Sequence, residues 1–179
     1  FSCAYCTSNK MWEKRFRARS AENILGEIKE LIREYGVDHI NFADDTFTID
    51  KPRVLQFCEL LKKENLDIHW SCNVHINTVD LELLKEMKEA GCAEIWIGVE
   101  SGSPLILKEL KREYTIEQVK SVFRLAKDVG IRRLAYFMVG APSESRETIQ
   151  ETKRLIYEIA PDLIILSLLV PLPGCELYD

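Results

Sequence analysis

Two thiols near the start of the chain, Cys3 and Cys6, are the side chains whose type and spacing point most directly to chemistry. Cysteines separated by two residues can turn both sulfur atoms toward one centre. A pair of this kind occurs in redox dithiols, as half of a zinc site and as part of an iron–sulfur site. The pair by itself leaves all three interpretations open.

The residues around the pair weaken two of these interpretations. In a dithiol oxidoreductase the Cys-x-x-Cys segment normally opens a helix after a strand. Here the polar residues 7–10 follow, and we expect no helix before about Ser20. A zinc site needs two further ligands, and we do not expect His39, His69 or His75 to supply them. The meaning of the pair must therefore come from the rest of the chain.

The other four cysteines lie in apolar segments or after a turn: Cys58, Cys72, Cys92 and Cys175. We expect Cys58 and Cys92 to be small core residues, because free cysteine is among the most buried residue types. Cys72 lies near the end of a predicted strand, where sites form, and Cys175 is expected to be a bystander. Such sparse cysteines do not suit a secreted disulfide scaffold, so we expect reduced thiols in the cytoplasm.

Composition sets further limits. The 179 residues include 24 Lys and Arg against 29 Asp and Glu, for a formal net charge of −5, with 46% hydrophobic and 30% charged residues. This balance is typical of a soluble globular domain and argues against a generally basic nucleic-acid binder. No apolar run approaches the ~18 residues needed to cross a bilayer, and no N-terminal stretch resembles a signal peptide.

The apolar periodicity alternates between helix-like and strand-like segments, which must position the thiols. We predict helices at 20–35, 54–64, 81–90, 104–110, 115–130 and 144–159, and strands at 37–43, 67–73, 93–99, 131–139 and 162–170. Strands that begin about 31 residues apart, with a helix between them, predict right-handed crossovers and a parallel sheet. Apolar runs such as 163–166 predict strands buried on both faces. Five strands are too few for an eight-stranded barrel, which leaves a partial barrel or an open doubly wound sheet.

Polar residues and glycines gather where these strands end: 42–45, 71–73, 98–103, 139–142 and 169–171. In either architecture the functional site lies at the carboxyl ends of the strands. The alternative is that turns after strands simply need Asp, Asn, Gly and Ser for capping. That alternative explains any one turn better than it explains all five.

Seven segments follow one another along almost the whole chain: FSCAYCTSN, RFRARSAENILGEIKEL, FADDTFT, WSCN, GVESGS, FMVGAPSE and PLPGCELY. Together they resemble the radical S-adenosylmethionine (SAM) superfamily, most of all members with a cobalamin-binding domain ahead of the radical domain. The family's cluster motif is C-x-x-x-C-x-aromatic-C, in which Cys3 and Cys6 match the second and third ligands and Tyr5 the aromatic residue. The first cysteine would fall two residues before Phe1.

The resemblance implies an α/β fold, a partial TIM-type (β/α)6 barrel of parallel strands whose first strand precedes this chain. Residues 1–179 would form an N-terminally truncated radical SAM core, with any cobalamin-type or C-terminal domain outside it. The implied cofactors are a 4Fe-4S cluster on Cys3 and Cys6, SAM, and, through another domain, cobalamin. The implied activity is reductive cleavage of SAM to a 5′-deoxyadenosyl radical, or support of cobalamin-dependent methyl transfer. No catalytic residue is singled out.

The resemblance also suggests residues that bind SAM: Tyr5, Asp44, Asn73, Glu100, Ser101, Gly102, Arg112, Val139 and Gly140. Tyr5 and Val139 would form a wall for the adenine, and Gly140 would let its strand pass close by. Asp44 would hold the methionyl amino group, Asn73 the ribose, and 100–102 the ribose and methionine. Arg112 would pair with the substrate carboxylate. Turn capping by Asp44 and Asn73, and an exposed helix end for Arg112, are the structural alternatives.

The expected partners are a small-molecule substrate and an external one-electron donor of the flavodoxin or ferredoxin type. A basic stretch comprises Lys10, Lys14, Arg15, Arg17 and Arg19, interleaved with aromatic side chains. We interpret it as a solvated connector with Arg19 near the cofactor, rather than as a nucleic-acid site. Two other functions stay open: a thiol–disulfide oxidoreductase through Cys3 and Cys6, and a catalytically silent α/β domain that binds a ligand.

Overall fold

The computed structural model describes residues 1–13 and 15–178, in which helices and strands alternate. The helices are α1 (Ser8–Met11), α2 (Ala21–Tyr35), α3 (Lys51–Glu64), α4 (Leu81–Glu89), α5 (Pro104–Glu109), α6 (Ile116–Asp128) and α7 (Arg146–Ile159). The strands are β1 (His39–Phe42), β2 (His69–Val74), β3 (Cys92–Glu100), β4 (Arg132–Val139) and β5 (Leu163–Leu168). Each predicted helix and strand is present within a few residues of its expected bounds.

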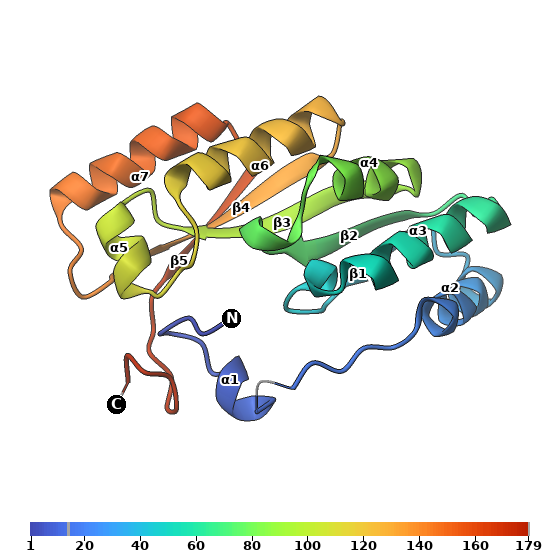
Figure 1. The fold of residues 1–179 in the computed structure, drawn as a ribbon, viewed down its shortest axis with the longest axis horizontal. Helices are drawn as coiled ribbons and strands as arrows, with labels where there is room; N and C mark the ends of the chain where they lie inside the picture. Colours follow the sequence, from blue (N-terminus) through green and yellow to red (C-terminus); the bar gives the residue numbers. More distant parts are fainter. Residues whose placement is uncertain (14, 179) are drawn as a thin grey trace.

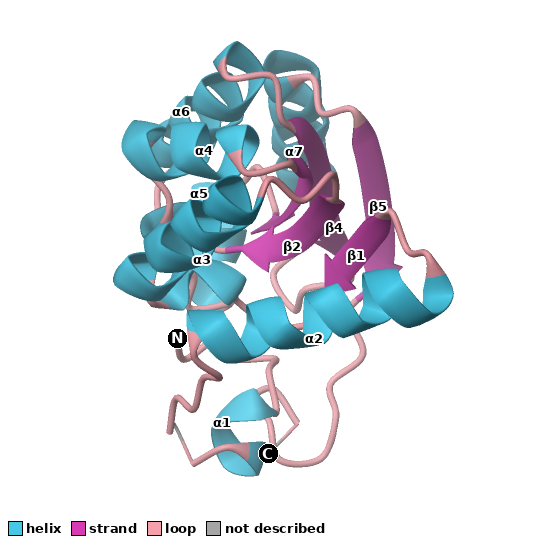
Figure 2. Cartoon of the chain, turned by 90° about the vertical axis from the view of Figure 1, so that its right-hand side faces the viewer, coloured by secondary structure: helices cyan, strands magenta, loops and turns pink. Residues whose placement is uncertain are grey.

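The strands form one parallel sheet in the order β1-β2-β3-β4-β5. The sheet curls, and helices cover its outer face while its inner face is left open (Figures 1 and 2). The chain is therefore an α/β half-barrel, as predicted, and not a flat doubly wound sheet. A sixth strand ahead of Phe1 stays a prediction.

Local signals in the sequence explain where helices begin and end. The Ser20 side chain accepts a hydrogen bond from the backbone N–H of Asn23, and Gly36 ends α2 in a left-handed conformation at φ +63°. Thr115 and Ser145 cap α6 and α7 in the same way. These caps satisfy amide groups that a helix cannot pair internally.

The core lies between the sheet and the helices. Phe42 of β1 stacks on Phe47 with ring centroids 4.3 Å apart, and both meet the edges or faces of Phe57 and Trp70. The Trp70 indole N–H donates to the carbonyl oxygen of Ala90 at 2.8 Å, which satisfies its only polar atom.

Three cysteines are part of this core. Cys58 and Cys92 are buried, as predicted, and Cys72 is also buried, on the face of β2 that packs against the helices. Burial raises the pKa of Cys58 to about 12. All six cysteines of the chain are free. The buried thiols of Cys58, Cys72 and Cys92 therefore act as small apolar side chains.

The inner face of β1 and β2 is polar. The register pairs His39 with His69, Asn41 with Ser71, and Asn73 with Trp96, so these residues share that face. Ser71 hydrogen-bonds both His39, at 3.1 Å, and Asn41, at 3.4 Å. In closed barrels the corresponding positions are filled mainly by Val, Ile and Leu. A polar inner face indicates a space that holds ligand or water and is not a dry core.

Two expectations from the sequence are wrong. β5 is not buried on both faces, because the side chains from Leu163 to Leu168 are all exposed. β5 is an edge strand, and in the described part of the chain no helix follows it to cover its outer face. A helix also forms earlier than expected: α1 begins two residues after Cys6, although it has only four residues.

No helix of the described residues is both long enough and apolar enough to span a membrane.

The carboxyl end of β3 is fastened to α7. The backbone N–H of Gly102 donates to Oγ1 of Thr152 at 2.9 Å, and Oγ of Ser101 lies 3.1 Å from the same atom. A Cβ atom on Gly102 would come within 2.5 Å of the Thr152 Cα atom. Glycine is therefore required here so that the two backbones can approach.

A pair of glycine substitutions tests this junction. Gly102→Ala is expected to lower the free energy of unfolding by about 1–3 kcal/mol, because the methyl group overlaps the α7 backbone. Gly26→Ala, in the exposed middle of α2 with no atom within 4 Å of the new Cβ, is expected to raise it by about 0.5–1 kcal/mol. Urea unfolding followed by circular dichroism measures both. Equal effects of the two substitutions would contradict the close approach.

Candidate functional site at the carboxyl ends of the strands

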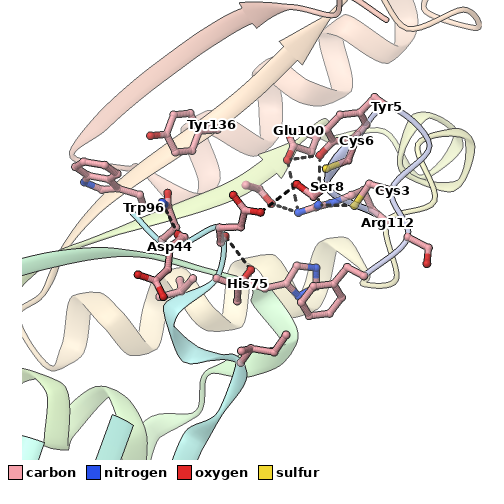
Figure 3. Close-up of a pocket in the computed structure, with 18 of the residues that line it drawn as sticks. Cys3, Tyr5, Cys6, Ser8, Asp44, His75, Trp96, Glu100, Arg112 and Tyr136 are labelled. Atoms are coloured by element: carbon pink, nitrogen blue, oxygen red, sulfur yellow. Dashed lines mark hydrogen bonds and ion pairs between the residues drawn. The ribbon is translucent and has the colours of Figure 1, made fainter. Parts of the chain in front are cut away.

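A cavity of about 800 Å³ lies where the N-terminal loop meets the carboxyl ends of the strands (Figure 3). Seven of the residues proposed from the sequence line it: Cys3, Tyr5, Cys6, Asp44, Asn73, Glu100 and Arg112. They come from the loop, from the ends of β1, β2 and β3, and from the connection between α5 and α6. The structure therefore brings together residues that are more than 100 positions apart.

The loop that carries the two thiols is fixed by backbone hydrogen bonds. Cys6 N–H donates to the carbonyl oxygen of Cys3 at 3.2 Å, which closes a turn with both side chains on it. Between them, buried Ala4 donates to the carbonyl oxygen of Leu110 and accepts from the N–H of Leu177. The thiols are thus held between the end of α5 and the C-terminal segment.

A bulge at the end of β3 turns Glu100 into the cavity. The pairing of β3 with β4 shifts between Gly98 and Glu100, and Glu100 has the left-handed φ of +62°. A non-glycine residue rarely adopts this conformation, which costs of order 1–3 kcal/mol and clusters at functional sites. Gly98 makes room for it, because a Cβ there would lie 2.6 Å from the Glu100 carboxylate.

Arg112 connects Glu100 to the thiol loop. Its Nη2 lies 3.5 Å from the Glu100 carboxylate, and the two side chains are only 7% and 9% exposed. Nη2 also donates to the carbonyl oxygen of Gly98 at 2.8 Å, and Nε donates to the Tyr114 hydroxyl at 2.8 Å. Nη1 donates to Sγ of Cys3 at 3.1 Å. The exposed helix end expected as the alternative for Arg112 is therefore wrong.

Tyr5 completes the network. Its hydroxyl donates to Glu100 at 2.9 Å and accepts from Nη1 of Arg112 at 3.3 Å. Burial raises the pKa of Tyr5, and the negative charge of Glu100 raises it further. Burial also raises the pKa of Glu100, while Arg112 and Tyr5 oppose that rise. The tyrosine is therefore a neutral donor at physiological pH.

His75, which the sequence analysis set aside, forms another part of the wall. Its ring stacks on Phe1 with centroids 3.6 Å apart, and Nδ1 accepts from the backbone N–H of Asn77 at 3.2 Å. Burial, with the positive charge of Arg112, lowers the pKa of His75 to about 3. The imidazole is therefore neutral at pH 7. Its position two residues after the strand predicted at 67–73 was the signal that could have identified it.

The opposite wall carries Asp44, Trp96 and Tyr136 (Figure 3). The Asn73 amide donates to the carbonyl oxygen of Asp44 at 3.0 Å, which links the ends of β1 and β2. Trp96 and Tyr136 are half-buried on the inner face of β3 and β4. Sequence reasoning missed both, although alternation along these strands assigns them to the face opposite the core.

Four of the proposed residues do not line the cavity: Ser101, Gly102, Val139 and Gly140. Ser101 and Gly102 are buried against α7. The Gly140 N–H donates to the Glu144 carboxylate at 2.6 Å, and the Val139 carbonyl oxygen accepts from Leu169. Their contact with a cofactor stays a prediction.

The basic stretch contributes to the rim of the cavity. Arg15 and Arg17 line it, whereas Arg19 does not and instead pairs with Glu27 on α2. The expectation that Arg19 lies near the cofactor stays a prediction. Lys14 lies outside the described residues.

The sulfur atoms of Cys3 and Cys6 limit which metal centres the loop can bind. Thiolate ligands suit iron–sulfur clusters and zinc. Among the described residues, no third Cys, His, Asp or Glu joins Cys3 and Cys6 in a group that could hold a metal ion. The two half-buried thiols beside a cationic side chain fit part of an iron–sulfur ligand set.

Comparison with known proteins agrees with this geometry. The family model of the radical SAM superfamily matches residues 1–156. The chain is 35% identical to an uncharacterized methyltransferase of Pyrococcus horikoshii and 32% identical to the anaerobic magnesium-protoporphyrin IX monomethyl ester cyclase of Cereibacter sphaeroides. Both matches cover 100% of this chain but only 39% and 30% of those proteins.

A solved structure shares the fold. The radical SAM methyltransferase TsrM from Kitasatospora setae, determined with cobalamin and a [4Fe-4S] cluster bound, superimposes with a TM-score of 0.87. The match covers 98% of this chain and 34% of that one, at 18% sequence identity. At this identity the likeness concerns the half-barrel fold.

The depressed pKa of His75 predicts a pH dependence of stability. The unfolded chain takes up a proton on His75 near pH 6.5 and the folded chain does not, so stability should fall as the pH is lowered from 7.5 to 5. In His75→Asn, which keeps an acceptor for Asn77, the fall should be shallower. Urea unfolding at several pH values measures this, with His69→Asn, which removes an exposed imidazole, as the control. Parallel curves for His75→Asn and the parent would contradict a neutral buried imidazole.

Proposed function

The chain belongs to the radical SAM superfamily, and from this we propose that it is the part of a radical SAM enzyme that holds a 4Fe-4S cluster and SAM and cleaves SAM reductively. One observation carries the proposal. Cys3 and Cys6 stand at the mouth of a cavity that is bordered by the carboxyl ends of the parallel strands, next to the buried Glu100–Arg112 pair.

Cys3 and Cys6 would hold the cluster as two of its three protein ligands, and a cysteine upstream of Phe1 would supply the first. When bound, the cluster supplies the electron that breaks the sulfonium C–S bond of SAM, giving methionine and a 5′-deoxyadenosyl radical. The protein's task is to orient SAM and to exclude water from the radical. The loop with its thiols, fixed on both sides through Ala4, suits that task.

The charges in the cavity match the polar groups of SAM. Asp44 is an exposed carboxylate at the end of β1 and can accept from the methionyl ammonium group. Asn73, beside it, and Glu100 can bond the ribose hydroxyls. The guanidinium of Arg112 can face a carboxylate. Tyr5 offers an aromatic edge for the adenine, and contacts from Val139 and Gly140 complete the proposal.

The reaction that follows SAM cleavage is inferred from the relatives. The relatives named above include methyltransferases and a cyclase, and this chain spans well under half of their length. We propose a small-molecule substrate, methyl transfer supported by cobalamin on a domain outside this chain, and an external one-electron donor of the flavodoxin or ferredoxin type. The six free cysteines suit the reducing cytoplasm.

Anaerobic reconstitution of the full-length protein tests the proposal. We expect iron and sulfide to bind, with a broad absorption near ~400 nm that dithionite bleaches, as iron–sulfur clusters show. Cys3→Ala and Cys6→Ala should each lose most of the bound iron. Cys58→Ala, which removes a core thiol on α3, should keep it. Reductant and SAM should then yield 5′-deoxyadenosine or a methylated product.

Two results would contradict the proposal. A colourless protein that titrates two reactive thiols would indicate a thiol–disulfide oxidoreductase. A cluster-loaded protein that consumes no SAM under reductant would indicate a silent ligand-binding domain.

A further inference from the structure

We propose that Arg112 is a positioning residue that sets the reduction potential of the iron–sulfur cluster through its hydrogen bond to Sγ of Cys3. The inference rests on the proposed function. It goes beyond that function because it assigns Arg112 a role that does not depend on SAM.

The hydrogen bond is held in place by the surroundings of the guanidinium. Nη1 donates to Cys3 Sγ at 3.1 Å, while the other two nitrogens are bound to Tyr114 and to the carbonyl oxygen of Gly98. The group also lies over the ring of Tyr114, 4.9 Å from its centroid. A planar guanidinium fixed on three sides cannot turn away from the sulfur. The donor is therefore present before any ligand binds.

The charge of Arg112 acts on the sulfur with little screening. The guanidinium side chain is 7% exposed, and its counter-ion, Glu100, is held by Tyr5 on its other side. A buried charge interacts more strongly with its neighbours than an exposed one. A donor to a ligand sulfur, and a nearby positive charge, both stabilise the more negative state of a cluster. Arg112 should thus raise the potential, and Glu100 should partly lower it.

Reduction transfers one electron from the external donor to the cluster, and no bond within the protein forms or breaks. The midpoint potential therefore reports the electrostatic effect alone. If it is measured without SAM, it is also independent of any contact between Arg112 and the carboxylate of SAM.

The experiment is a redox titration of the cluster at one pH, without SAM, followed by electron paramagnetic resonance in the full-length protein. In Arg112→Gln we expect the ratio of reduced to oxidised cluster at a fixed poise to fall at least tenfold, a shift of about 59 mV for one electron. Arg112→Lys keeps the charge but not the fork of donors, so its shift should be smaller. Arg133→Gln is the control, because Arg133 is equally buried and pairs with Asp162 at the other end of β4.

Glu100→Gln gives a prediction of opposite sign. Loss of the negative charge should raise the midpoint potential. If the pair had a purely structural role, Glu100→Gln and Arg112→Gln would shift the potential in the same direction. The double variant Arg112→Gln/Glu100→Gln buries no unpaired charge. The midpoint potential of its cluster should still lie below that of the parent protein. If Arg112→Gln takes up no cluster, this double variant tests the inference in its place.

The outcomes are distinct. A parent protein with a normal cluster signal, in which Arg112→Gln or the double variant matches Arg133→Gln, overturns this inference and leaves the proposed function standing. A parent protein that forms no cluster overturns both.

Discussion

The burial of the Glu100–Arg112 pair is the constraint on which the rest of the site depends. Removal of two charges from water costs several kcal/mol per ion unless their remaining hydrogen-bonding groups are also satisfied. Tyr5, Tyr114 and the carbonyl oxygen of Gly98 supply those partners. They come from the N-terminal loop, from the connection between α5 and α6 and from β3, so these three segments must meet at one point. The position of the thiol loop follows from the same requirement.

The two faces of the sheet have different roles: the outer face stabilises the fold, and the inner face borders the site. The outer face carries Phe42, Trp70 and their neighbours, and its apolar packing holds the helices. The inner face carries polar side chains such as Asn41, Ser71 and Asn73, which cannot form a dry core. Because the outer face provides the stability, the inner face is free to border a cavity. The bulge at Glu100 then directs a buried carboxylate into the cavity. Its left-handed backbone conformation is strained, and the packing around it holds it in place.

The sequence was sufficient for features that depend on local signals. Ser20 and Gly36 mark the ends of α2 because capping is decided within a few residues, and the parallel order follows from the strand spacing. Seven of the proposed site residues line the cavity: six lie at strand ends or in the N-terminal loop, and Arg112 lies between α5 and α6. Features set by distant neighbours were missed. The exposure of β5 depends on what covers the sheet edge, and the environment of His75 depends on Phe1 and Tyr114 packing against it. Neither is encoded near the residue itself.

The two walls of the cavity differ in how their side chains are held. On the thiol side, each polar group of Arg112 and Glu100 has a partner, so a substitution there disturbs its neighbours. On the opposite side, Trp96 and Tyr136 are half-buried on the open face, and the Trp96 indole N–H donates to the Glu94 carboxylate. A substitution on the thiol side would leave a buried charge unpaired, whereas the half-buried rings on the opposite side carry no charge of their own.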